Sequence, residues 1–564
     1  MGDIDYQSLQ LEYRPVPADA PDHYPVIIVG AGPVGMSMAL DMAQHGHKVL
    51  VLDDDHTLSI GSRAICFAKR TLDIWDRLDI GERMVRKGIS WNVGRIFFRD
   101  EEVWNFNLLP ESGHRRPAFI NLQQYYCEGY LYEKCEADPN IEIRWRNRVV
   151  EVQPANSQVT LTVDTPDGPY SISTDWLIAC DGARSPVRKM LGQEAHGQIF
   201  RDRFLIADVK LEADFPEERW FWFDPPFHPN QSVLLHSQPD NVWRIDFQLG
   251  WDADPAEEVK PERVLPRIKA LLGKDVDVQL EWVSVYTFAC ERMDSFRHGR
   301  VFFAGDAAHR VSPFGARGAN SGVQDIDNLA WKLDLVMRGR APDALLDTYC
   351  EERQAAADEN ILDSTRSTDF ITPKSETSLL FRNTVLRLAK QHDFARRLVN
   401  SGRLSEATFY TESSLNTPDV DEFTATLPVG GVAPDGPVSR DGHTTWWLSQ
   451  LGKNFVIAVF CKDSLPDAAS LQQMANPDFQ SLPVRCILVV SPELEGDIAA
   501  TGIEYVVDQD SILAGRYDVR GGACYLIRPD QHIAARWRNV DIVRIRQALL
   551  RATSTHQEVP SCHN

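Results

Sequence analysis

The stretch Pro25-Val-Ile-Ile-Val-Gly-Ala-Gly-Pro-Val-Gly35 decides the fold of this 564-residue chain. An apolar run typical of a buried strand leads directly into a Gly-x-Gly-x-x-Gly turn, and a helical pattern of apolar residues follows. The first glycine permits a tight turn, the second lets backbone approach a pyrophosphate, and the third lets helix and strand pack closely. The sequence therefore predicts a Rossmann-like dinucleotide-binding unit whose turn consists of Gly30, Ala31, Gly32 and Gly35.

An acidic residue follows the second predicted strand of this unit. Residues 49–52 form an apolar strand pattern that ends at Asp53, about 20 residues beyond the glycine turn, where the fold places a carboxylate for the adenosine ribose. Asp54 and Asp55 are adjacent, so the assignment among the three acids stays open. We favour Asp53 because it directly follows the strand. This unit alone does not distinguish FAD from NAD.

A second informative region spans residues 300–333. It predicts a short apolar strand over 301–304, a carboxylate at its tip (Asp306), a turn with Gly315 and Gly318, and then a helix. A helix start offers unpaired N–H groups and a positive dipole end, which suit a phosphate or an electron-rich ring oxygen.

A third motif lies between these two, in residues 176–188. It is an apolar strand followed by Asp181-Gly182, which alone would suggest only a turn that caps a strand. Together and in this order, the three motifs resemble those of FAD-dependent aromatic hydroxylases. In that family the aspartate matching Asp306 holds the ribityl chain, and the loop and helix start after it line the isoalloxazine ring. The resemblance implies further FAD contacts from Asp181, Gly182, Gly305, Pro313, Gly318, Ala319 and Asn320.

Two smaller matches extend the implied FAD site. Arg63, in Gly61-Ser-Arg-Ala64, stands where the family carries an arginine close to the FAD phosphates, and a planar guanidinium suits a pyrophosphate. Gln123 matches a glutamine that contacts the cofactor in relatives. The alternative interpretation of Arg63 and of Gln123 is an ordinary surface side chain with no cofactor contact.

The positions of the motifs predict the domain organisation. Because flavin contacts are expected near residues 30, 181 and 306, the FAD domain must be discontinuous. Residues 219–249 alternate bulky apolar and polar residues and predict a sheet over the flavin for an aromatic substrate. The expected fold class is α/β: a Rossmann-like FAD domain interleaved with a β-sheet substrate domain, as in p-hydroxybenzoate hydroxylase-like proteins, plus a C-terminal thioredoxin-like domain. The predicted boundaries are 24–90 with 140–200 and 295–365 (FAD), 91–139 with 201–294 (substrate sheet), 366–424 (helical connector), 425–552 (thioredoxin-like) and 553–564 (tail).

The C-terminal region changes character from about residue 425, where a Pro- and Gly-rich linker precedes strand patterns at 455–460, 486–490 and 523–527. Residues 526–537 resemble the end of the thioredoxin-like domain of phenol hydroxylase-type proteins. The ten cysteines contain no C-x-x-C pair, so neither a zinc site nor a disulfide framework is indicated. We expect a packing module or a homodimer contact here, not a disulfide exchanger.

Composition excludes several classes of partner. The formal net charge of −22 argues against nucleic acid and against anionic lipid, because both need a basic face. The first 24 residues show no signal-peptide pattern, and no apolar run of about 18 residues could span a membrane. The expectation is a cytoplasmic enzyme with a small-molecule substrate.

The resemblance implies a specific chemistry. NAD(P)H, a transient cosubstrate, reduces FAD; dioxygen adds at flavin C4a; and the hydroperoxide hydroxylates a phenolic ring, with or without a carboxylate, in aromatic catabolism. A protein group must take the phenol proton. Tyr286 matches a tyrosine of hydroxyphenylpropionate hydroxylases, and a neutral His236 imidazole could also accept a proton, although packing roles compete for both. The Pro313 carbonyl is expected to face flavin and substrate.

Three other features leave questions open. Arg244 and Asp246 are interpreted as a polar strand face, whereas Arg317 replaces a glutamine of the family loop and would put a cation near the flavin. Residues 220–223, Trp-Phe-Trp-Phe, superficially resemble a flavin-dependent halogenase motif, although Asp224 replaces its isoleucine. A non-catalytic flavin-binding scaffold is the remaining alternative. The ring hydroxylated, the choice of NADH or NADPH, and the oligomeric state are not determined by the sequence.

Overall fold

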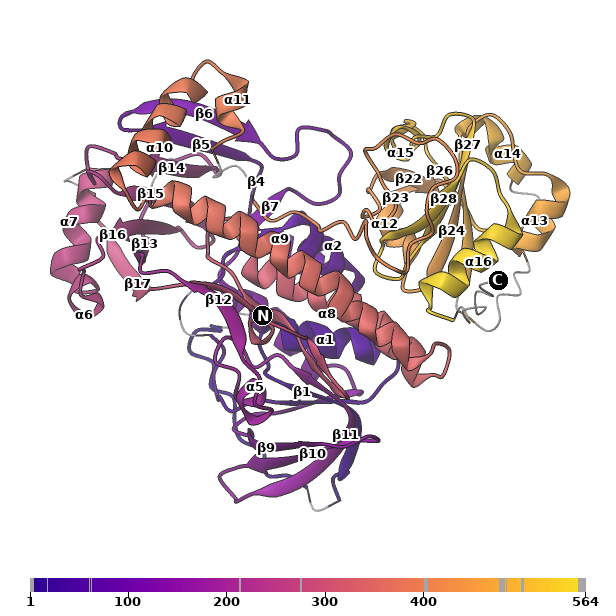
Figure 1. Cartoon of the computed structure of the whole chain (residues 1–564), viewed down its shortest axis with the longest axis horizontal. Helices are drawn as coiled ribbons and strands as arrows, with labels where there is room; N and C mark the ends of the chain where they lie inside the picture. The colour runs from indigo at the N-terminus through magenta and orange to yellow at the C-terminus, as the bar shows by residue number, and fades with distance from the viewer. Residues whose placement is uncertain are drawn as a thin grey trace, which may run out of the picture. The chain divides into compact units, whose positions relative to one another are not determined.

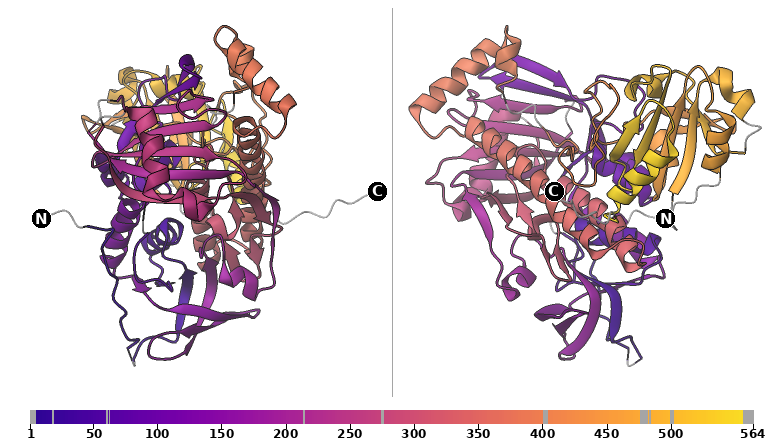
Figure 2. Two further views of the ribbon diagram at one scale, coloured as in Figure 1. Left: turned by 90° about the vertical axis from the view of Figure 1, so that its left-hand side faces the viewer. Right: turned by 45° about the vertical axis from the view of Figure 1, so that its right-hand side comes forward.

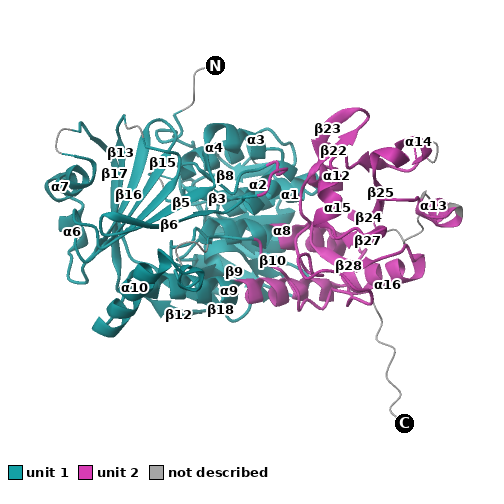
Figure 3. Cartoon of the chain, turned by 90° about the horizontal axis from the view of Figure 1, so that it is seen from above, with its two compact units in different colours: residues 1–110, 116–326, 357–406 teal, residues 111–115, 327–356, 407–564 magenta. Residues whose placement is uncertain are grey.

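The computed structural model describes residues 5–17, 19–59, 61, 63–212, 215–273, 276–399, 404–475, 482, 484–498 and 502–555. The chain divides into two compact units (Figure 3): residues 1–110, 116–326 and 357–406 form the first, and 111–115, 327–356 and 407–564 form the second. The division falls within helices α8 (Gly318–Met337) and α9 (Asp347–Ile371). Ser62, Cys562 and residues 556–564 of the predicted tail lie outside the described residues.

The first unit contains the predicted nucleotide-binding sheet. Its strands run in the order β19-β20-β11-β1-β2-β8, and the pairs from β20 to β8 are parallel. Buried strand residues and helix α1 (Pro33–Gln44), which packs on β2, explain the continuous apolar patterns. Figure 1 shows β1 and β11 side by side below α1. The strands are β1 (His23–Val29), β2 (Val49–Leu52), β8 (Ile141–Arg144), β11 (Tyr170–Ala179), β19 (Arg297–His298) and β20 (Val301–Phe303), with β9 (Arg148–Pro154) and β10 (Val159–Asp164) antiparallel beyond β11.

Each motif found in the sequence follows one of these parallel strands. β1 ends one residue before Gly30, β2 ends one residue before Asp53, and β11 and β20 end two residues before Asp181 and Gly305 respectively. Since the carboxyl ends of parallel strands lie along one edge of the sheet, four segments distant in sequence meet there. The predicted strands at 25–29, 49–52 and 301–304 are confirmed within two residues, and a helix follows the first glycine turn as predicted.

A second sheet of the first unit has the order β17-β13-β16-β15-β14-β5-β6. One face carries an apolar core that includes Val264 and Ile268 of helix α7 (Pro261–Leu272), so that helix covers this face (Figure 2, left). The strands predicted within 219–249 are therefore confirmed. They are β5 (Val93–Phe98), β6 (Glu101–Asn107), β13 (Arg203–Lys210), β14 (Arg219–Phe223), β15 (Ser232–Gln238), β16 (Val242–Leu249) and β17 (Gln279–Tyr286), with α6 (Pro255–Glu258) beside them.

Smaller elements connect the two sheets of the first unit. Helix α4 (Gln124–Glu136) packs against α1, and the helix predicted after Gly318 is confirmed as α8. Helices α9 and α10 (Glu376–Ala389) follow it along the chain. Two three-stranded sheets, β3-β7-β4 and β12-β18-β21, complete the framework. Their elements are β3 (Cys66–Ala68), β4 (Ile89–Trp91), β7 (Phe119–Asn121), β12 (Ala195–Ile199), β18 (Ala289–Met293) and β21 (His309–Arg310), with helices α2 (Lys69–Arg77), α3 (Gly81–Lys87), α5 (Pro186–Met190) and α11 (Asp393–Arg396).

The second unit is built on a sheet of order β23-β22-β26-β25-β24-β27-β28. β24, β25 and β26 are parallel, whereas β27 and β28 are antiparallel to their neighbours. Apolar cores lie on both faces, and the three strand patterns predicted here are confirmed. The elements are β22 (Pro437–Arg440), β23 (His443–Trp446), α12 (Trp447–Leu451), β24 (Phe455–Cys461), α13 (Ala468–Ala475), β25 (Val484–Val490), α14 (Glu495–Ile498), β26 (Tyr505–Val507), α15 (Ile512–Arg516), β27 (Gly522–Ile527), β28 (Ile533–Trp537) and α16 (Ile542–Ala552).

Candidate cofactor and substrate site

The glycine turn after β1 has no room for side chains on its inner side. Gly30 has a φ of +104°, and a Cβ placed on it would lie 2.4 Å from the Cys180 carbonyl oxygen. A Cβ on Gly35 would lie 1.9 Å from the Gly30 carbonyl oxygen. Both positions therefore require glycine. A Cβ on Gly32 would meet no atom within 4 Å, so the backbone there presents an open side that a phosphate can approach.

Among the three adjacent acids after β2, Asp53 is the one joined to this turn. Its Oδ2 accepts a hydrogen bond from the Ala31 backbone N–H at 2.6 Å, and its Oδ1 accepts one from Asp55 at 2.8 Å. Burial raises the pKa of Asp53 to about 6, against the lowering effect of these two donors. Asp54 and Asp55 are exposed. This geometry agrees with the preference for Asp53.

The Asp181-Gly182 motif lies beside the same turn, because the inner side of Gly30 contacts Cys180. Asp181 Oδ2 accepts a hydrogen bond from the Val187 backbone at 2.9 Å, while its buried Oδ1 has no hydrogen-bond partner among the described residues. Burial raises the pKa of this carboxyl. The Arg188 guanidinium donates to the Ala307 carbonyl at 2.7 Å and so links this motif to the Gly305-Asp306 turn.

The Gly305-Asp306 turn is held by a buried pair that the sequence did not reveal. Asp325 of α8 accepts hydrogen bonds from the Gly305 backbone N–H and from His309 Nε2, both at 2.8 Å. Helix α8 comes very close: a Cβ on its Gly322 would lie 3.1 Å from Gly305 Cα. Asp306 itself is solvent-accessible, yet its pKa is raised because protein atoms surround it. A carboxylate in this situation is available to hydroxyl groups of a ligand.

Two residues that the sequence assigned to the cofactor, Pro313 and Asn320, form hydrogen bonds within the protein. The Pro313 carbonyl accepts a hydrogen bond from the Ala316 backbone at 3.1 Å, so it closes a turn within the loop. The Asn320 side chain is committed to protein groups, because it accepts from Ala68 at 2.8 Å and donates to Cys66 at 2.9 Å. A contribution of Asn320 to a cofactor would therefore come from its backbone at the start of α8. The preceding Gly318 and Ala319 are half-buried there.

Arg63 and Gln123 contact the substrate sheet. The Arg63 side chain is exposed, and its carbonyl accepts a hydrogen bond from Arg244 of β16 at 3.0 Å. Gln123 is buried and donates to the Pro239 carbonyl at 3.0 Å, whereas its Oε1 has no partner among the described residues. Arg63 is thus free to reach a diphosphate, while Gln123 offers only one buried acceptor.

These features fit FAD, the cofactor that the sequence motifs imply. The open backbone at Gly32, the acceptor Asp53, the buried unpartnered oxygen of Asp181 and the accessible Asp306 stand along one edge of the parallel sheet. An elongated ligand with a diphosphate and hydroxylated chains provides complementary groups for each of them. FAD is such a ligand.

The second sheet turns its other face, opposite α7, toward the loops that contain Arg63 and Phe314. Phe204 of β13 packs its ring against Phe314 of the loop before α8, with centroids 4.8 Å apart. Four residues further along the strands, on the same face, Asp208 and Arg244 are joined by hydrogen bonds of 2.8 and 2.9 Å. Since Arg244 also contacts Arg63, this face is bounded by the Arg63 loop at one end and the Phe314 loop at the other.

The two predicted proton acceptors lie on this face. Burial, together with Arg219 and Arg244, holds the pKa of His236 well below its usual range, so its imidazole is neutral. The Tyr286 pKa is raised well above its usual range, mainly by burial, so this phenol keeps its proton. Tyr286 can therefore donate a hydrogen bond but is a poor base. Arg317 is buried, 3.5 Å from Asp363.

The tryptophans that suggested a halogenase belong to the opposite face of the sheet. Trp222 packs against Phe97, with ring centroids 5.1 Å apart, and Trp220 contacts Phe215 at 5.6 Å. Both belong to the apolar core beneath α7. Their alternation reflects packing against that helix.

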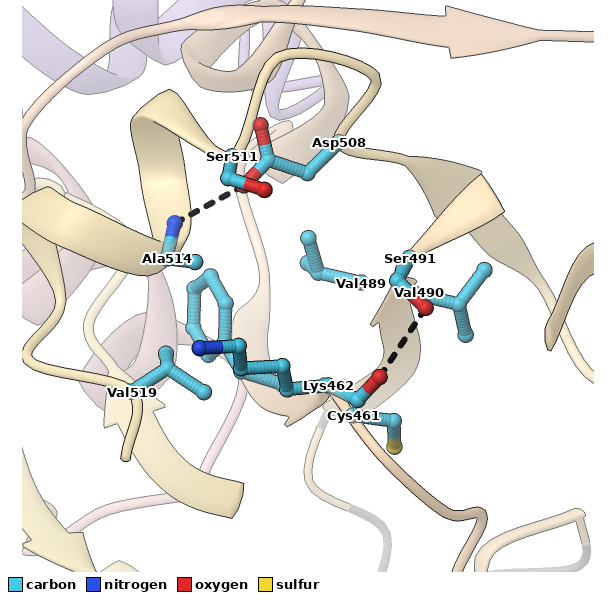
Figure 4. Close-up of a pocket in the computed structure, with 10 residues that line it drawn as sticks. Cys461, Lys462, Val489, Val490, Ser491, Asp508, Ser511, Ala514 and Val519 are labelled. Atoms are coloured by element: carbon cyan, nitrogen blue, oxygen red, sulfur yellow. Dashed lines mark hydrogen bonds between the residues drawn. The ribbon is translucent and has the colours of Figure 1, made fainter. Parts of the chain in front are cut away.

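The second unit has a small pocket, with room for about one water molecule, at the carboxyl ends of β24, β25 and β26 (Figure 4). Asp508 accepts a hydrogen bond from the Ala514 backbone at 2.8 Å and thereby secures the start of α15. The Cys461 sulfur points away from Asp508 and Ser511 in Figure 4. Burial raises the pKa of the Cys461 thiol to about 12. A thiol in this state is a weak nucleophile.

Among the described residues, no cluster of His, Cys, Asp and Glu is arranged to hold a metal ion. In the same part of the chain no helix has the length and apolarity needed to cross a bilayer.

Comparison with known proteins agrees with this geometry. Residues 23–364 match the family described as "FAD binding domain". The chain is 32% identical over 336 residues, 58% of its length and 62% of the relative's, to the "Probable NADH-specific resorcinol 4-hydroxylase" of Rhodococcus jostii (strain RHA1). It is 26% identical over 525 residues, covering 90% of this chain and 88% of the other, to the 3-(3-hydroxy-phenyl)propionate/3-hydroxycinnamic acid hydroxylase of Mycobacterium sp. (strain JLS).

Solved structures show the same fold. The flavin-dependent monooxygenase PieE, in complex with FAD and substrate, superposes with a TM-score of 0.79 at 22% identity, covering 95% of this chain and 100% of that one. The family match, the named relatives and the motif geometry agree, and none of them supports a halogenase. The chain therefore belongs to the FAD-binding domain family and, within it, to the FAD-dependent aromatic hydroxylases, which are single-component flavoprotein monooxygenases.

Proposed function

We propose that this enzyme hydroxylates a phenolic ring, with or without a carboxylate, in the breakdown of aromatic compounds. The observation that carries the proposal is the sheet face between the Arg63 and Phe314 loops, which combines aromatic side chains with buried arginine, aspartate and histidine side chains. Relatives named for resorcinol and for hydroxyphenylpropionate, both phenols, support the choice of a phenolic ring. Bound FAD, reduced by NAD(P)H, supplies one oxygen atom of dioxygen to the ring.

The chain's own residues would hold FAD at the edge of the parallel sheet. In this proposal Gly30, Ala31 and Gly32 receive the diphosphate with Arg63, Asp53 receives the adenosine ribose, and Asp306 receives the ribityl chain. Asp181 and the backbone at the start of α8 complete the contacts to the ring system. In this proposal Pro313 and Gln123 contribute to FAD binding indirectly, because their hydrogen bonds hold the loops beside the cofactor.

The aromatic side chains of the sheet would exclude water from the reacting ring. Phe204, Phe221 and Phe223 are buried on this face, in one core with Phe314. A dry site favours oxygen transfer over loss of hydrogen peroxide. Arg219, buried beside Asp246, gives the site a positive charge suited to a phenolate or carboxylate. Arg317 interacts with Arg219 and adds to that charge.

Tyr286 enters the proposal as a hydrogen-bond donor. We expect Tyr286→Phe to bind FAD normally, to hydroxylate more slowly and to release more hydrogen peroxide per NAD(P)H, because substrate positioning is lost. Simultaneous assay of product and peroxide measures this ratio. Unchanged coupling would remove Tyr286 from the mechanism.

The C-terminal region of the second unit is proposed to be a thioredoxin-like domain that mediates homodimerisation. Strands β24 and β25 in parallel, followed by the antiparallel hairpin of β27 and β28 and by α16, support this assignment. The single buried Cys461 at the carboxyl end of β24 supports a packing role without disulfide exchange. Analytical ultracentrifugation of the holoenzyme would test dimerisation. The domain boundaries and the cytoplasmic location expected from the sequence remain parts of this proposal.

The decisive experiment follows NAD(P)H oxidation with a panel of phenols, hydroxybenzoates and hydroxyphenylalkanoates under labelled dioxygen. Label in a hydroxylated product with little hydrogen peroxide supports the proposal and identifies the substrate class and the preferred nicotinamide. Failure of NAD(P)H to bleach the flavin with every phenol would contradict it and favour a non-catalytic flavin-binding scaffold.

A further inference from the structure

The face of the substrate sheet between the Arg63 and Phe314 loops carries three rows of side chains that run across the strands. The row nearest the Arg63 loop contains Asp208, Arg244 and His236, paired on neighbouring strands. The row nearest the Phe314 loop contains Phe204 and Gln248. The middle row therefore lies at the centre of the face, where a ring held by both loops would be placed.

Asp246 is the only carboxylate of that middle row among the described residues. The register places it opposite Ile206 on one side and Leu234 on the other, so its lateral neighbours are apolar. Alternation along β16 confirms its direction, because Ile245 and Phe247 belong to the core under α7. A carboxylate between aliphatic side chains at the centre of a substrate face needs a functional reason.

The hydrogen bonds of Asp246 are incomplete. Its Oδ1 is buried and has no hydrogen-bond partner among the described residues, and the same is true of Nδ1 of His236. The nearest approach of the two side chains is 3.9 Å, between His236 Nε2 and Asp246 Oδ2, which is too long for a hydrogen bond. The Asp246 side chain is 13% exposed, so a ligand can reach it. Buried polar groups without partners are uncommon and costly, which indicates a missing hydrogen-bonding ligand.

Arg244 does not neutralise this carboxylate by direct pairing, although the sequence had suggested that the two form one polar face. Its guanidinium is bonded to Asp208, at 2.8 and 2.9 Å. Within the described part of the chain, Asp246 therefore has no direct ion pair with an arginine and can interact with a substrate, while Arg244 and Arg219 supply positive charge nearby.

We propose that Asp246 accepts the phenolic proton of the substrate, an inference that rests on the proposed hydroxylation of a phenol. The phenol O–H bond breaks, a new O–H bond forms on the Asp246 carboxylate, and the electron pair stays on the phenolate oxygen. The buried Arg219 and Arg244 stabilise that anion. Neutral His236 positions the hydroxyl, and Tyr286 remains a protonated donor.

The charge environment sets the working pH of this group. Burial raises the pKa of Asp246 to about 6, Arg244 and Arg219 oppose that rise, and Asp208 adds to it. The other titratable groups facing it are His236, which is neutral, and Tyr286 and Cys66, whose pKa values are raised so that both stay protonated. Asp246 is accordingly ionised and able to accept a proton above about pH 6, and it is blocked below that pH.

The test compares wild type with Asp246→Asn, Asp246→Glu and the exposed control Asp252→Asn, all as FAD holoenzymes. The substrate is resorcinol or 3-(3-hydroxyphenyl)propionate, whichever the wild type hydroxylates. We expect kcat/KM of wild type and control to be level above about pH 6 and to fall tenfold per pH unit below it. Asp246→Asn should lose ~10²–10⁴-fold at neutral pH. Its rate should recover tenfold per unit toward the phenol's own pKa of about 10.

A binding measurement without NAD(P)H provides a readout independent of turnover. Phenolate absorbance in the ultraviolet difference spectrum should appear when the phenol binds wild type at neutral pH. It should be absent in Asp246→Asn and partly restored in Asp246→Glu. A merely structural role for Asp246 would change affinity or flavin content without removing the phenolate signal.

The outcomes separate this inference from the proposed function. If wild type hydroxylates no phenol, the proposed function fails and the inference fails with it. If wild type is active but Asp246→Asn keeps its rate, or its phenolate signal, only the inference is overturned. If Asp246→Asn does not retain FAD, the wild-type profile decides: a level kcat/KM from pH 5 to pH 7 would exclude Asp246 as the acceptor.

Discussion

Replacing Glu352 with glutamine should destabilise the second unit severely, because Glu352 is the hub of a buried charge network. Its carboxylate accepts hydrogen bonds from Arg528 at 2.5 and 2.9 Å, from Lys332 at 2.7 Å and from Asn328 at 2.6 Å. The side chains of Lys332, Glu352, Arg528 and Asp530 are fully buried. Two positive and two negative charges balance within this network, so Glu352→Gln leaves one positive charge uncompensated.

The size of the effect follows from that imbalance. Removing one partner of a buried ion pair costs about 3–5 kcal/mol. For a unit of this length, about 2–4 °C per kcal/mol predicts a fall of roughly 6–20 °C in the unfolding midpoint. Glu412→Gln, an exposed replacement in the same unit, should change the midpoint by less than about 2 °C, in line with surface substitutions within about 0.5 kcal/mol.

Circular dichroism of the holoenzymes during heating measures both shifts. Arg528 and Lys332 hold the pKa of Glu352 well below its usual range, although burial opposes them. A lowered folded-state pKa contributes stability above the unfolded value of about 4.3 and loses it as the pH falls further. The difference between wild type and Glu352→Gln should therefore be full at neutral pH and shrink in acid. A midpoint equal to that of the Glu412 control at neutral pH would refute the role assigned to the network.

Three further predictions concern the flavin site and the thiols. Gly30→Ala should purify with little flavin, because its Cβ would overlap the Cys180 carbonyl oxygen at 2.4 Å. The control Gly250→Ala, whose Cβ would meet no atom within 4 Å, should keep its flavin. Equal flavin absorbance in the two variants would contradict the packing argument. Asp306→Ala should also lose flavin, and a fully loaded variant would show that the ribityl contact lies elsewhere. Cys461 should resist Ellman's reagent in the native protein and react after unfolding, because burial raises the pKa of its thiol to about 12. Mass spectrometry identifies the labelled cysteine. Rapid labelling of Cys461 in the native protein would argue against a purely structural thiol.

Local patterns predicted the framework of the flavin site because each motif is continuous in sequence. The strand, glycine turn and helix around Gly30 need only neighbouring residues, and the structure reproduces them. The same holds for the strands before Asp53 and Gly305. Their convergence could be anticipated because parallel strands share one carboxyl edge.

Contacts between distant segments could not be predicted in this way. The Asn320 side chain accepts a hydrogen bond from Ala68, 252 positions away, and this contact gave no signal in the sequence. The Asp325–His309 pair was not predicted, because the resemblance assigns a role to neither residue although both lie within residues 300–333. Asp246 was interpreted as part of a polar strand face, and only the sheet register shows that this face meets the Arg63 and Phe314 loops. A period of two reveals that a strand has two faces but not what each face contacts.

The strand order of the nucleotide-binding sheet has a consequence for biosynthesis. β1 can pair early with β2, but its other neighbour, β11, ends at Ala179, and β20 ends at Phe303. At translation rates of about 5–20 residues per second, roughly 6–25 s separate the emergence of the second strand from that of β11. During this interval the edge of β1 remains unpaired and its apolar residues lack cover. A nascent chain therefore cannot capture FAD until most of the first unit has been made, and chaperone binding to the early strands would protect the edge that later receives β11.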